Sequence, residues 1–266
     1  MEYAWYWRDD SGRWIEYGEE HPDHCSATVK SADLENEFLA DQTGVVLFRA
    51  GSQIQNITLS HSVCPPQWDR SALPDIGYKL VELSYTSSEY GNIKRLFEKT
   101  MKDYYIHQLQ RIQNPALWQV FQWQKEQMRK LNKSKPVDER LLFHGTSPSH
   151  VPAICEQNFD WRICGTHGTK YGKGSYFARD ASYSHAYCSS RSGRYSMFVA
   201  HVLVGDFVQG NPEYVRPPPR CSNSNRLYDS CVDDLTDPSI FVIFEKHQIY
   251  PAYILEYSSG AQCMIL

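Results

Sequence analysis

The second half of the chain is a succession of short apolar runs separated by polar turns, and this pattern restricts the fold more than any other feature. Short runs rich in Val, Ile, Phe and Tyr predict β-strands. Apolar and polar residues alternate along 195–204, which predicts a strand with one buried face. Only four residues separate the last two runs, so we expect these runs to pair as a closing hairpin. The predicted strands are 141–143, 195–204, 240–244 and 249–257.

Helical patterns lie between residues 89 and 158. Residues 89–102 have helical periodicity, whereas 105–112 has a strand-like pattern. Asn114 followed by Pro115 is typical of a helix start, because Asn caps the N-terminus and Pro suits the first helical position. A further short helix is expected to end near Asn158. The apolar face predicted for the helix that starts at Pro115 contains Leu117, Phe121, Met128 and Leu131.

The first 86 residues have the pattern of a separate, small α+β module. Two aromatic runs flank an Asp-Ser-Gly turn, which predicts a hairpin. Thr86-Ser87-Ser88 marks a boundary, so we assign residues 1–86 and 87–266 to two domains. The elements expected in the first domain are hairpin strands 3–7 and 13–17, a helix capped by Ser31, and strands 45–48 and 54–59.

Charge and composition exclude several classes of protein. The 266 residues carry a net charge of −4, and residues 1–86 alone hold 14 acidic against 6 basic side chains, so charge gives no reason to expect DNA or RNA binding. No apolar run reaches the roughly 18 residues that a membrane helix needs, so we expect no membrane association. The eight cysteines form no C-x-x-C pair and no cluster with zinc-site spacing. We therefore expect reduced thiols, no metal, and an intracellular location in the cytoplasm, the nucleus or both.

Familiar catalytic motifs are absent, but a set of separated segments remains. Residues 172–175 are not a Walker phosphate loop, and no dinucleotide-binding glycine motif, G-x-S-x-G elbow or H-E-x-x-H helix occurs. The remaining segments are Phe143-His144-Gly145-Thr146, residues 172–178 (GKGSYFA), residues 183–187 (YSHAY) and residues 237–244 (DPSIFVIF). In this order and spacing they resemble the catalytic domain of the PARP family, the diphtheria-toxin-like ADP-ribosyltransferases, over roughly residues 100–257.

The resemblance implies a fold, a substrate and a role for each matched residue. The implied fold is α+β, with packed, mostly antiparallel sheets and flanking helices. The implied substrate is NAD⁺, with no metal. The Gly145 backbone and the Ser184 hydroxyl would bind the nicotinamide amide, and Tyr176 and Tyr187 would stack on its ring. His144, followed by Gly145 and Thr146 in the cofactor-binding segment, would hydrogen-bond the adenine-side ribose.

The third residue of the family's catalytic triad, after His144 and Tyr176, falls on Ile240. Polymer-forming members carry Glu at this position, and isoleucine cannot polarise the hydroxyl of an attached ADP-ribose. The resemblance therefore implies transfer of a single unit to a protein, with automodification as one form of it. Acidic side chains, Cys and other acceptors remain open. The alternative is a catalytically silent protein that binds ADP-ribose or acts as a scaffold.

The first domain resembles a WWE domain, which is named for two Trp and one Glu. We place these residues at Trp7, Trp14 and Glu35, with Trp5 as an alternative for the first. WWE domains in relatives recognise ADP-ribose or poly(ADP-ribose), and Trp7, Trp14 and Gln53 are the candidate binding residues. A block with a net charge of −8 is an unfavourable host for a diphosphate. The other interpretation is that these Trp residues build a small core and the domain docks a protein partner.

Overall fold

The structure is a computed structural model, and it describes two compact units separately. One unit spans residues 1–67 and the other spans residues 68–266. The described residues are 6–8, 14–17, 29–30, 33–34, 45–50, 53–58, 64–74, 76–132, 135–160, 169–221 and 225–260.

The first unit contains two antiparallel strand pairs. Strands β1 (Tyr6–Arg8) and β2 (Trp14–Glu16) pair with Trp7 opposite Ile15, and β3 (Val45–Ala50) pairs with β4 (Gln53–Thr58). The predicted hairpin of 3–17 and the predicted strands 45–48 and 54–59 are therefore confirmed. The helix start predicted at Ser31, the alternative Trp5 and the proposed signature residue Glu35 lie outside the described residues.

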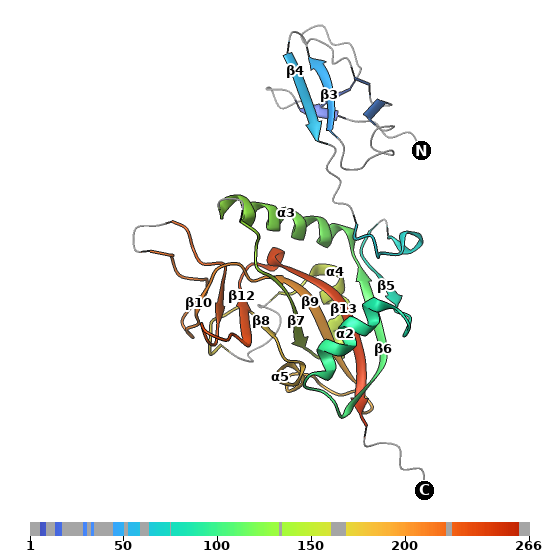
Figure 1. Cartoon of the computed structure of the whole chain (residues 1–266), viewed down its shortest axis with the longest axis vertical. Helices are drawn as coiled ribbons and strands as arrows, with labels where there is room; N and C mark the ends of the chain where they lie inside the picture. Colours follow the sequence, from blue (N-terminus) through green and yellow to red (C-terminus); the bar gives the residue numbers. More distant parts are fainter. Residues whose placement is uncertain are drawn as a thin grey trace. The chain divides into compact units, whose positions relative to one another are not determined.

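The second unit is built on a nine-stranded sheet (Figure 1). Every strand pair is antiparallel except the pair of β10 and β11, so the predicted mostly antiparallel α+β fold is confirmed. The order across the sheet is β10 (Phe207–Gln209), β11 (Ser230–Val232), β12 (Ile240–Ile243), β8 (Ser175–Ala178), β7 (Glu139–Gly145), β9 (Tyr195–Leu203), β13 (Ile249–Ser259), β6 (Tyr104–Gln113) and β5 (Lys79–Glu82).

The sheet is weakest where β7 meets β8. The two strands share a single residue pair, Phe143 opposite Ala178, whereas β7 and β9 are paired over seven positions from Glu139 to Gly145. The sheet thus consists of a four-stranded part and a five-stranded part that are joined through this one position. Such a junction leaves the backbone groups of both strands available to side chains, and His144 lies directly beside it.

Helices cover both faces of the larger part of the sheet. Helix α2 (Ser88–Glu98) lies against β6 and β13, where Phe97 packs edge-on against Tyr257 at 5.0 Å (Figure 1). Helix α4 (Val151–Gln157) supplies Ile154 and Cys155 to a buried cluster that includes Ile254. Adjacent residues of a strand point to opposite faces. Because Tyr253 bonds to α2 through Glu89 and Ile254 packs against α4, the two helices lie on opposite faces.

Helix α3 (Pro115–Leu131) begins as the sequence predicts. The Asn114 side chain accepts a hydrogen bond from the Leu117 amide, and Pro115 occupies the first helical position. Phe121 and Met128 of the predicted apolar face are buried, whereas Leu131 is exposed. The buried face of the helix therefore ends at Met128.

Residues 68–86 pack within the larger unit. Trp68 stacks on Tyr250 at 6.0 Å, and Asp69 and Gln113 exchange two hydrogen bonds of 2.7 and 2.9 Å. Strand β5 pairs with β6 at the edge of the sheet. The compact units therefore divide between residues 67 and 68, before the sequence-based boundary at 86/87.

Two strand predictions are wrong. The predicted closing hairpin does not form: β12 pairs with β8 and β11, whereas β13 pairs with β6 and β9. The 3₁₀ turn η3 (Lys246–Gln248) carries the chain from one part of the sheet to the other, so a short turn here does not bring its flanking strands together. Strand β9 is also not half-buried, because Met197 to Ala200 are buried without alternation in the middle of a sheet covered on both faces.

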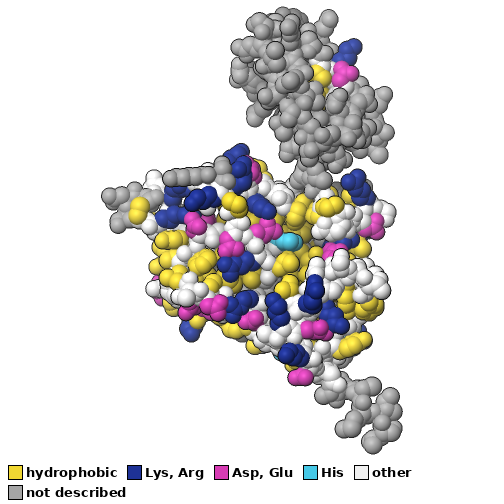
Figure 2. Space-filling view, viewed as in Figure 1, with side chains coloured by type: hydrophobic (Ala, Val, Ile, Leu, Met, Phe, Trp, Pro, Cys, Tyr) yellow, Lys and Arg dark blue, Asp and Glu magenta, His cyan; other side chains and the backbone are white. Residues whose placement is uncertain are grey.

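Residues 87–140 carry 11 basic against 6 acidic side chains, and several of the basic side chains pair with carboxylates. Nζ of Lys125 lies 2.6 Å from Oε2 of Glu139, and Nε of Arg129 lies 2.7 Å from Oε2 of Glu126. Lys94 and Glu98 form a further pair one helical turn apart. Figure 2 shows basic and acidic side chains interspersed over the visible face of this unit. Part of the positive charge of this segment is therefore offset by ion pairs that involve α2 and α3.

Replacing Trp68 tests whether residues 68–86 stabilise the larger unit. Trp68 is only 5% exposed and contacts Tyr250 and Trp118, so Trp68→Ala should lower the free energy of unfolding of this unit by about 3–5 kcal/mol. Trp123→Ala is the matched control, because Trp123 is 60% exposed on α3 and its loss should change stability by less than about 0.5 kcal/mol. Chemical denaturation followed by circular dichroism measures both. Equal effects of the two substitutions would contradict the placement of Trp68 in this core.

Candidate active site

His144 lies at the end of β7, where that strand separates from β8. Its Nδ1 is 2.8 Å from the carbonyl oxygen of Tyr176 on β8. A carbonyl oxygen only accepts hydrogen bonds, so Nδ1 carries the proton and Nε2 is a hydrogen-bond acceptor. The ring packs edge-on against Phe159 at 4.8 Å and lies 5.3 Å from Phe177. The strand junction therefore presents an imidazole in a single tautomer and orientation.

The surroundings of His144 keep the imidazole neutral. Burial lowers its pKa to about 4, and the hydrogen bond to Tyr176 offsets only part of this effect. Nearby His150 lowers the pKa further when it is charged. At neutral pH the Nε2 atom is therefore an acceptor for a hydroxyl rather than a cationic donor.

Gly145 brings the end of β7 into close contact with helix α5 (Ala181–His185). A Cβ at Gly145 would lie 1.8 Å from the Ser184 carbonyl oxygen and 3.0 Å from Cys188 Sγ. No side chain fits at such distances, so glycine is required for this approach. The contact brings together two predicted site residues, Gly145 and Ser184, that lie 39 positions apart in the sequence.

Ser184 is a buried residue whose hydroxyl has no hydrogen-bond partner among the described residues. The residue is 3% exposed, and among the described parts of the chain no hydrogen bond reaches its side chain. A buried hydroxyl normally has a partner, and leaving one without costs about 1–3 kcal/mol. Thr146, by contrast, has its hydroxyl 3.3 Å from Nδ1 of His150. Ser184 thus has the character of a ligand-binding group, and Thr146 that of a loop anchor.

Tyr176 forms hydrogen bonds through its backbone carbonyl and through its side-chain hydroxyl. Its hydroxyl donates to the Gly172 carbonyl and accepts from the Tyr171 amide, both at 2.9 Å, and burial raises its pKa. Gly172 has φ +132°, and a Cβ there would lie 2.6 Å from the Phe244 ring. Because the hydroxyl is already paired, the ring is the part of Tyr176 that remains for a ligand.

Tyr187 follows α5 and pairs with Tyr183. The two hydroxyls are 3.2 Å apart and the ring centres 5.5 Å apart. Tyr187 is also near enough to Tyr176 to raise the pKa of that residue. Tyr187 is 45% exposed, so its ring has a free surface on which a flat ligand can stack.

Ile240 begins β12 on the same face of the sheet as Tyr176. Val242 lies opposite Tyr176 and Ile240 lies opposite Ala178, so Tyr176 and Ile240 are diagonal neighbours. Ile240 is buried. The third predicted triad position therefore presents an aliphatic side chain beside Tyr176, where no carboxylate or other polar group of Ile240 can act.

Asp233 holds the start of β12 and was not found from the sequence. Its carboxylate accepts hydrogen bonds of 2.9 Å from the amides of Ser239 and Ile240, and one of 2.5 Å from the Ser239 hydroxyl. Burial raises the pKa of Asp233, but these hydrogen bonds outweigh burial and lower it overall. Phe159 was missed as well, although it packs against His144. Neither residue lies in a recognisable motif, and only the fold brings them to the site.

The tentative binding residues of the first unit lie on two separate strand pairs. Trp7 is on β1, Trp14 is on β2 opposite Arg8, and Gln53 starts β4 opposite Ala50. The structure describes only their backbone positions. Whether they form one site therefore stays a prediction.

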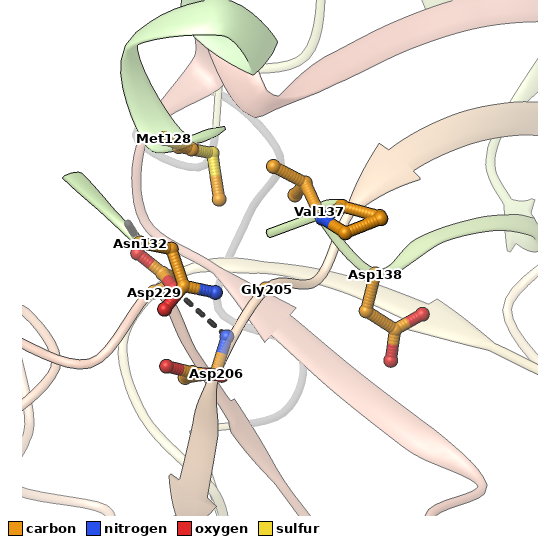
Figure 3. A pocket seen from close by; sticks show the side chains of 8 residues that line it. Met128, Asn132, Val137, Asp138, Gly205, Asp206 and Asp229 are labelled. Carbon is orange, nitrogen blue, oxygen red and sulfur yellow. Dashed lines mark hydrogen bonds between the residues drawn. The ribbon is translucent and has the colours of Figure 1, made fainter. Parts of the chain in front are cut away.

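The larger unit has a small hollow, which Figure 3 shows from close by. It has a volume of about 90 Å³, enough for a few waters. The Asp229 carboxylate in its wall accepts from the Asp206 amide at 2.8 Å and pairs with Arg220 at 3.0 Å. It contains none of the predicted site residues. Its lining residues are Met128, Asn132, Pro136, Val137, Asp138, Gly205, Asp206 and Asp229.

Among the residues that the structure describes, no group of three or more His, Cys, Asp or Glu side chains is placed to hold a metal ion. In the same part of the chain, none of the helices combines the length and the apolar character needed to cross a bilayer.

The site combines three chemical features. A neutral imidazole offers an acceptor for a hydroxyl, a buried serine hydroxyl lacks a partner within the described part of the chain, and two tyrosine rings offer faces for stacking. These features suit a ligand that has a flat ring with a polar substituent and a sugar hydroxyl.

Comparison with known proteins identifies relatives of both units. The poly(ADP-ribose) polymerase catalytic domain matches residues 87–259, and the WWE domain matches residues 3–63. Human protein mono-ADP-ribosyltransferase PARP12 is 44% identical over 307 aligned positions, which cover 98% of this chain and 44% of the human protein. Mouse protein mono-ADP-ribosyltransferase PARP11 is 36% identical, with 96% of this chain and 92% of the mouse protein covered. Mouse zinc finger CCCH-type antiviral protein 1 is 29% identical over 70% of this chain and 24% of its own length.

Replacing Gly145 tests the close contact between β7 and α5. The Cβ of Gly145→Ala would overlap the Ser184 carbonyl, so the free energy of unfolding should fall by about 1–3 kcal/mol or more. Gly91→Ala is the control, because Gly91 lies in α2 with no atom within 4 Å of an added Cβ. That change should raise stability by about 0.5–1 kcal/mol. Denaturant titration of the larger unit measures both, and a stabilising Gly145→Ala would contradict the contact.

The lowered pKa of His144 predicts the pH dependence of its charge and of stability. NMR titration should find the His144 imidazole still neutral at pH 5, because its folded pKa is about 4 against 6.5 when exposed. As the pH falls from 6.5 towards 4, the unfolded chain binds a proton that the folded chain does not, so His144 lowers the stability over this range. His144→Gln should lack that part of the loss. A His144 resonance that titrates near pH 6.5 would contradict this prediction.

Proposed function

Because the chain belongs to the poly(ADP-ribose) polymerase catalytic-domain family, we propose that it is an NAD⁺-dependent protein mono-ADP-ribosyltransferase. Members of this family use NAD⁺ as their substrate. The proposed reaction transfers one ADP-ribose unit to a protein side chain and releases nicotinamide. The observation that carries the proposal is the hydrogen bond from His144 Nδ1 to the Tyr176 carbonyl, which leaves Nε2 free to accept from a ribose hydroxyl.

The nicotinamide end of NAD⁺ is assigned to the region beside the contact between Gly145 of β7 and Ser184 of α5. The Ser184 hydroxyl would gain in the nicotinamide amide the partner that it lacks, and the Gly145 backbone would supply a second hydrogen bond. The rings of Tyr176 and Tyr187 would stack on the flat base. Thr146 would hold the loop that follows through His150. Each of these roles agrees with the burial and pairing of the residue.

The chemistry asks the protein mainly to orient the substrate. The bond that breaks joins the nicotinamide ring nitrogen to C1 of its ribose, and the electron pair leaves with neutral nicotinamide. A nucleophilic atom of the acceptor forms the new bond to the same carbon. The ribose carbon passes through an oxocarbenium-like state, so a bound, aligned nicotinamide lowers the barrier. No proton needs to be supplied to the leaving group.

The side chain of Ile240 supports transfer of a single unit. Chain growth requires a group that polarises a hydroxyl of the attached ADP-ribose, and an aliphatic side chain in this position cannot accept a hydrogen bond. An acidic acceptor side chain is already deprotonated at neutral pH and can attack without a protein base. The acceptor is a protein side chain, with automodification of this chain as one case. Carboxylate and Cys side chains are both compatible with the chemistry.

The first unit matches the WWE domain family, and its proposed ligand is ADP-ribose or poly(ADP-ribose). Trp7, Trp14 and Gln53 are the candidate contacts. The net charge of −8 over residues 1–86 works against a diphosphate ligand and keeps docking of a protein partner as the alternative.

The proposed location is intracellular, in the cytoplasm, the nucleus or both. Among the described residues, Cys155, Cys188, Cys221 and Cys231 are free thiols, which suits a reducing compartment.

The names of the relatives support an enzyme over a silent binding protein. Human PARP12 and mouse PARP11 are both named protein mono-ADP-ribosyltransferases. The chain spans less than half the length of human PARP12, so this activity, its acceptors and its partners are proposals for this chain.

Incubation with labelled NAD⁺ tests the proposal. We expect label to enter protein as single ADP-ribose units. Electrophoresis should show the labelled protein, and phosphodiesterase digestion should then release one product per modified site. His144→Ala should reduce the incorporation at least about tenfold, because the ribose loses its hydrogen-bond partner. His247→Ala is the control: this imidazole pairs with Glu245 beside η3 and contacts none of the site residues. Polymer formation, or no incorporation into any acceptor in spite of NAD⁺ binding, would overturn the proposal.

A further inference from the structure

Helix α5 carries much of the proposed nicotinamide site, yet it has little means to hold its own position. It has five residues, from Ala181 to His185, and Asp180 gives it no side-chain cap. Helices this short are unstable without tertiary contacts. Ser184 lies within it, and Tyr187 follows in the turn that continues it. The position of both groups therefore depends on what holds α5 against the rest of the protein.

His185 ties α5 to two strands of the sheet. Its Nε2 is 2.9 Å from the Tyr104 hydroxyl on β6, and its Nδ1 is 2.8 Å from the Tyr257 hydroxyl on β13. Tyr195 of β9 packs against the same ring at 4.7 Å. One imidazole thus contacts three neighbouring strands of the sheet, and both of its nitrogen atoms have partners.

The hydrogen bonds of this group fit one direction only. The Tyr257 hydroxyl donates to Cys188 Sγ at 3.4 Å, so its oxygen accepts from His185, and Nδ1 carries the proton. The neutral ring then has an unprotonated Nε2, which accepts from Tyr104. Burial lowers the pKa of His185 and raises that of Tyr257, which keeps both groups neutral. Each donor in the sequence Tyr104, His185, Tyr257, Cys188 therefore has a matching acceptor.

Cys188 connects these hydrogen bonds to the proposed nicotinamide site. Its Sγ lies 3.6 Å from the Ser184 carbonyl oxygen and 3.3 Å from that of Ser196. The Ser184 carbonyl is the atom that approaches Gly145 most closely. The hydrogen-bonded chain thus begins on β6 and ends at the backbone of Ser184, whose buried hydroxyl has no partner in the described ranges.

We infer that His185 is a positioning residue for the nicotinamide pocket and that it acts through Tyr104, Tyr257 and Cys188. This inference rests on the proposed function. The four side chains hold α5 from the side of the sheet, so that the Ser184 hydroxyl and the Tyr187 ring keep the places in which they meet the nicotinamide amide and ring. His144, which serves the ribose at the other end of the substrate, is not part of this group and is held by β8 instead.

Other contacts of α5 act in different directions. The Thr100 hydroxyl accepts a hydrogen bond of 3.2 Å from the Ser182 amide near the start of the helix. The backbone of α5 at Ser184 also lies directly against Gly145 of β7. These contacts keep α5 folded when the His185 group is weakened. The expected consequence is a shift of Ser184 and Tyr187 rather than loss of the fold.

Two matched tyrosine substitutions in β13 test the inference. Tyr257→Phe removes the hydroxyl between His185 and Cys188. Tyr253→Phe removes another hydroxyl from the same strand, one that bonds Glu89 of α2 at 2.8 Å. Inhibition of the transfer reaction by nicotinamide and by ADP reports the two ends of the NAD⁺ site separately. Tyr257→Phe should raise the inhibition constant of nicotinamide roughly fivefold and leave that of ADP within about twofold. Tyr253→Phe should change neither constant.

A second variant separates positioning from stability. His185→Phe keeps an aromatic ring and removes both nitrogen atoms, so it should reproduce the selective rise for nicotinamide, whatever its effect on Tm. Equal shifts for nicotinamide and ADP, or no shift with either variant, would overturn the inference. Absence of any transfer by the unchanged protein would instead overturn the proposed function, and this inference with it.

Discussion

The hydrogen bond from His144 to the Tyr176 carbonyl is the interaction on which the site depends. It forms where the nine-stranded sheet is joined by a single residue pair, so a side chain takes the place of part of the ladder between β7 and β8. The same bond fixes the tautomer of the imidazole and, together with burial by Phe159 and Phe177, its orientation. The weak point of the sheet and the acceptor atom of the site are therefore one feature.

Close backbone contacts bring the remaining groups to this junction. Gly145 allows α5 to approach the end of β7. Gly172, which lies just before β8, allows the backbone there to contact both the Phe244 ring and the Tyr176 hydroxyl. Glycine is needed at each position because a Cβ would overlap a neighbouring atom. The site is thus assembled from backbone approaches that tolerate no side chain, and its ligand-facing groups are carried on segments that these approaches hold in place.

The buried polar groups around the site are of two kinds: some hold a segment in place, and one is left to bind a ligand. Tyr176, Asp233 and His185 use their polar atoms on partners within the protein, and each holds a segment that carries a site residue. Ser184 differs because its buried hydroxyl lacks a partner among the described residues. A protein that leaves one buried hydroxyl unpaired beside several fully paired groups has an unmet hydrogen bond for a ligand to make.

The sequence by itself determined the local elements, and its resemblance to one family proposed the site residues around His144, Gly145, Tyr176, Ser184, Tyr187 and Ile240. Capping at Asn114 and Pro115 and the strands of the first unit were recognisable, because each is encoded by neighbouring residues. The strand partners of β12 and β13, the packing of Trp68 and β5 in the larger unit, and the roles of Asp233, Phe159 and His185 were not. Strand pairing and side-chain contacts join residues far apart in the chain, and a short turn such as 245–248 is compatible with either a hairpin or a crossing to another part of the sheet. Only the tertiary structure decided these, because the free energy that selects among such pairings comes from burial and hydrogen bonding across the whole sheet.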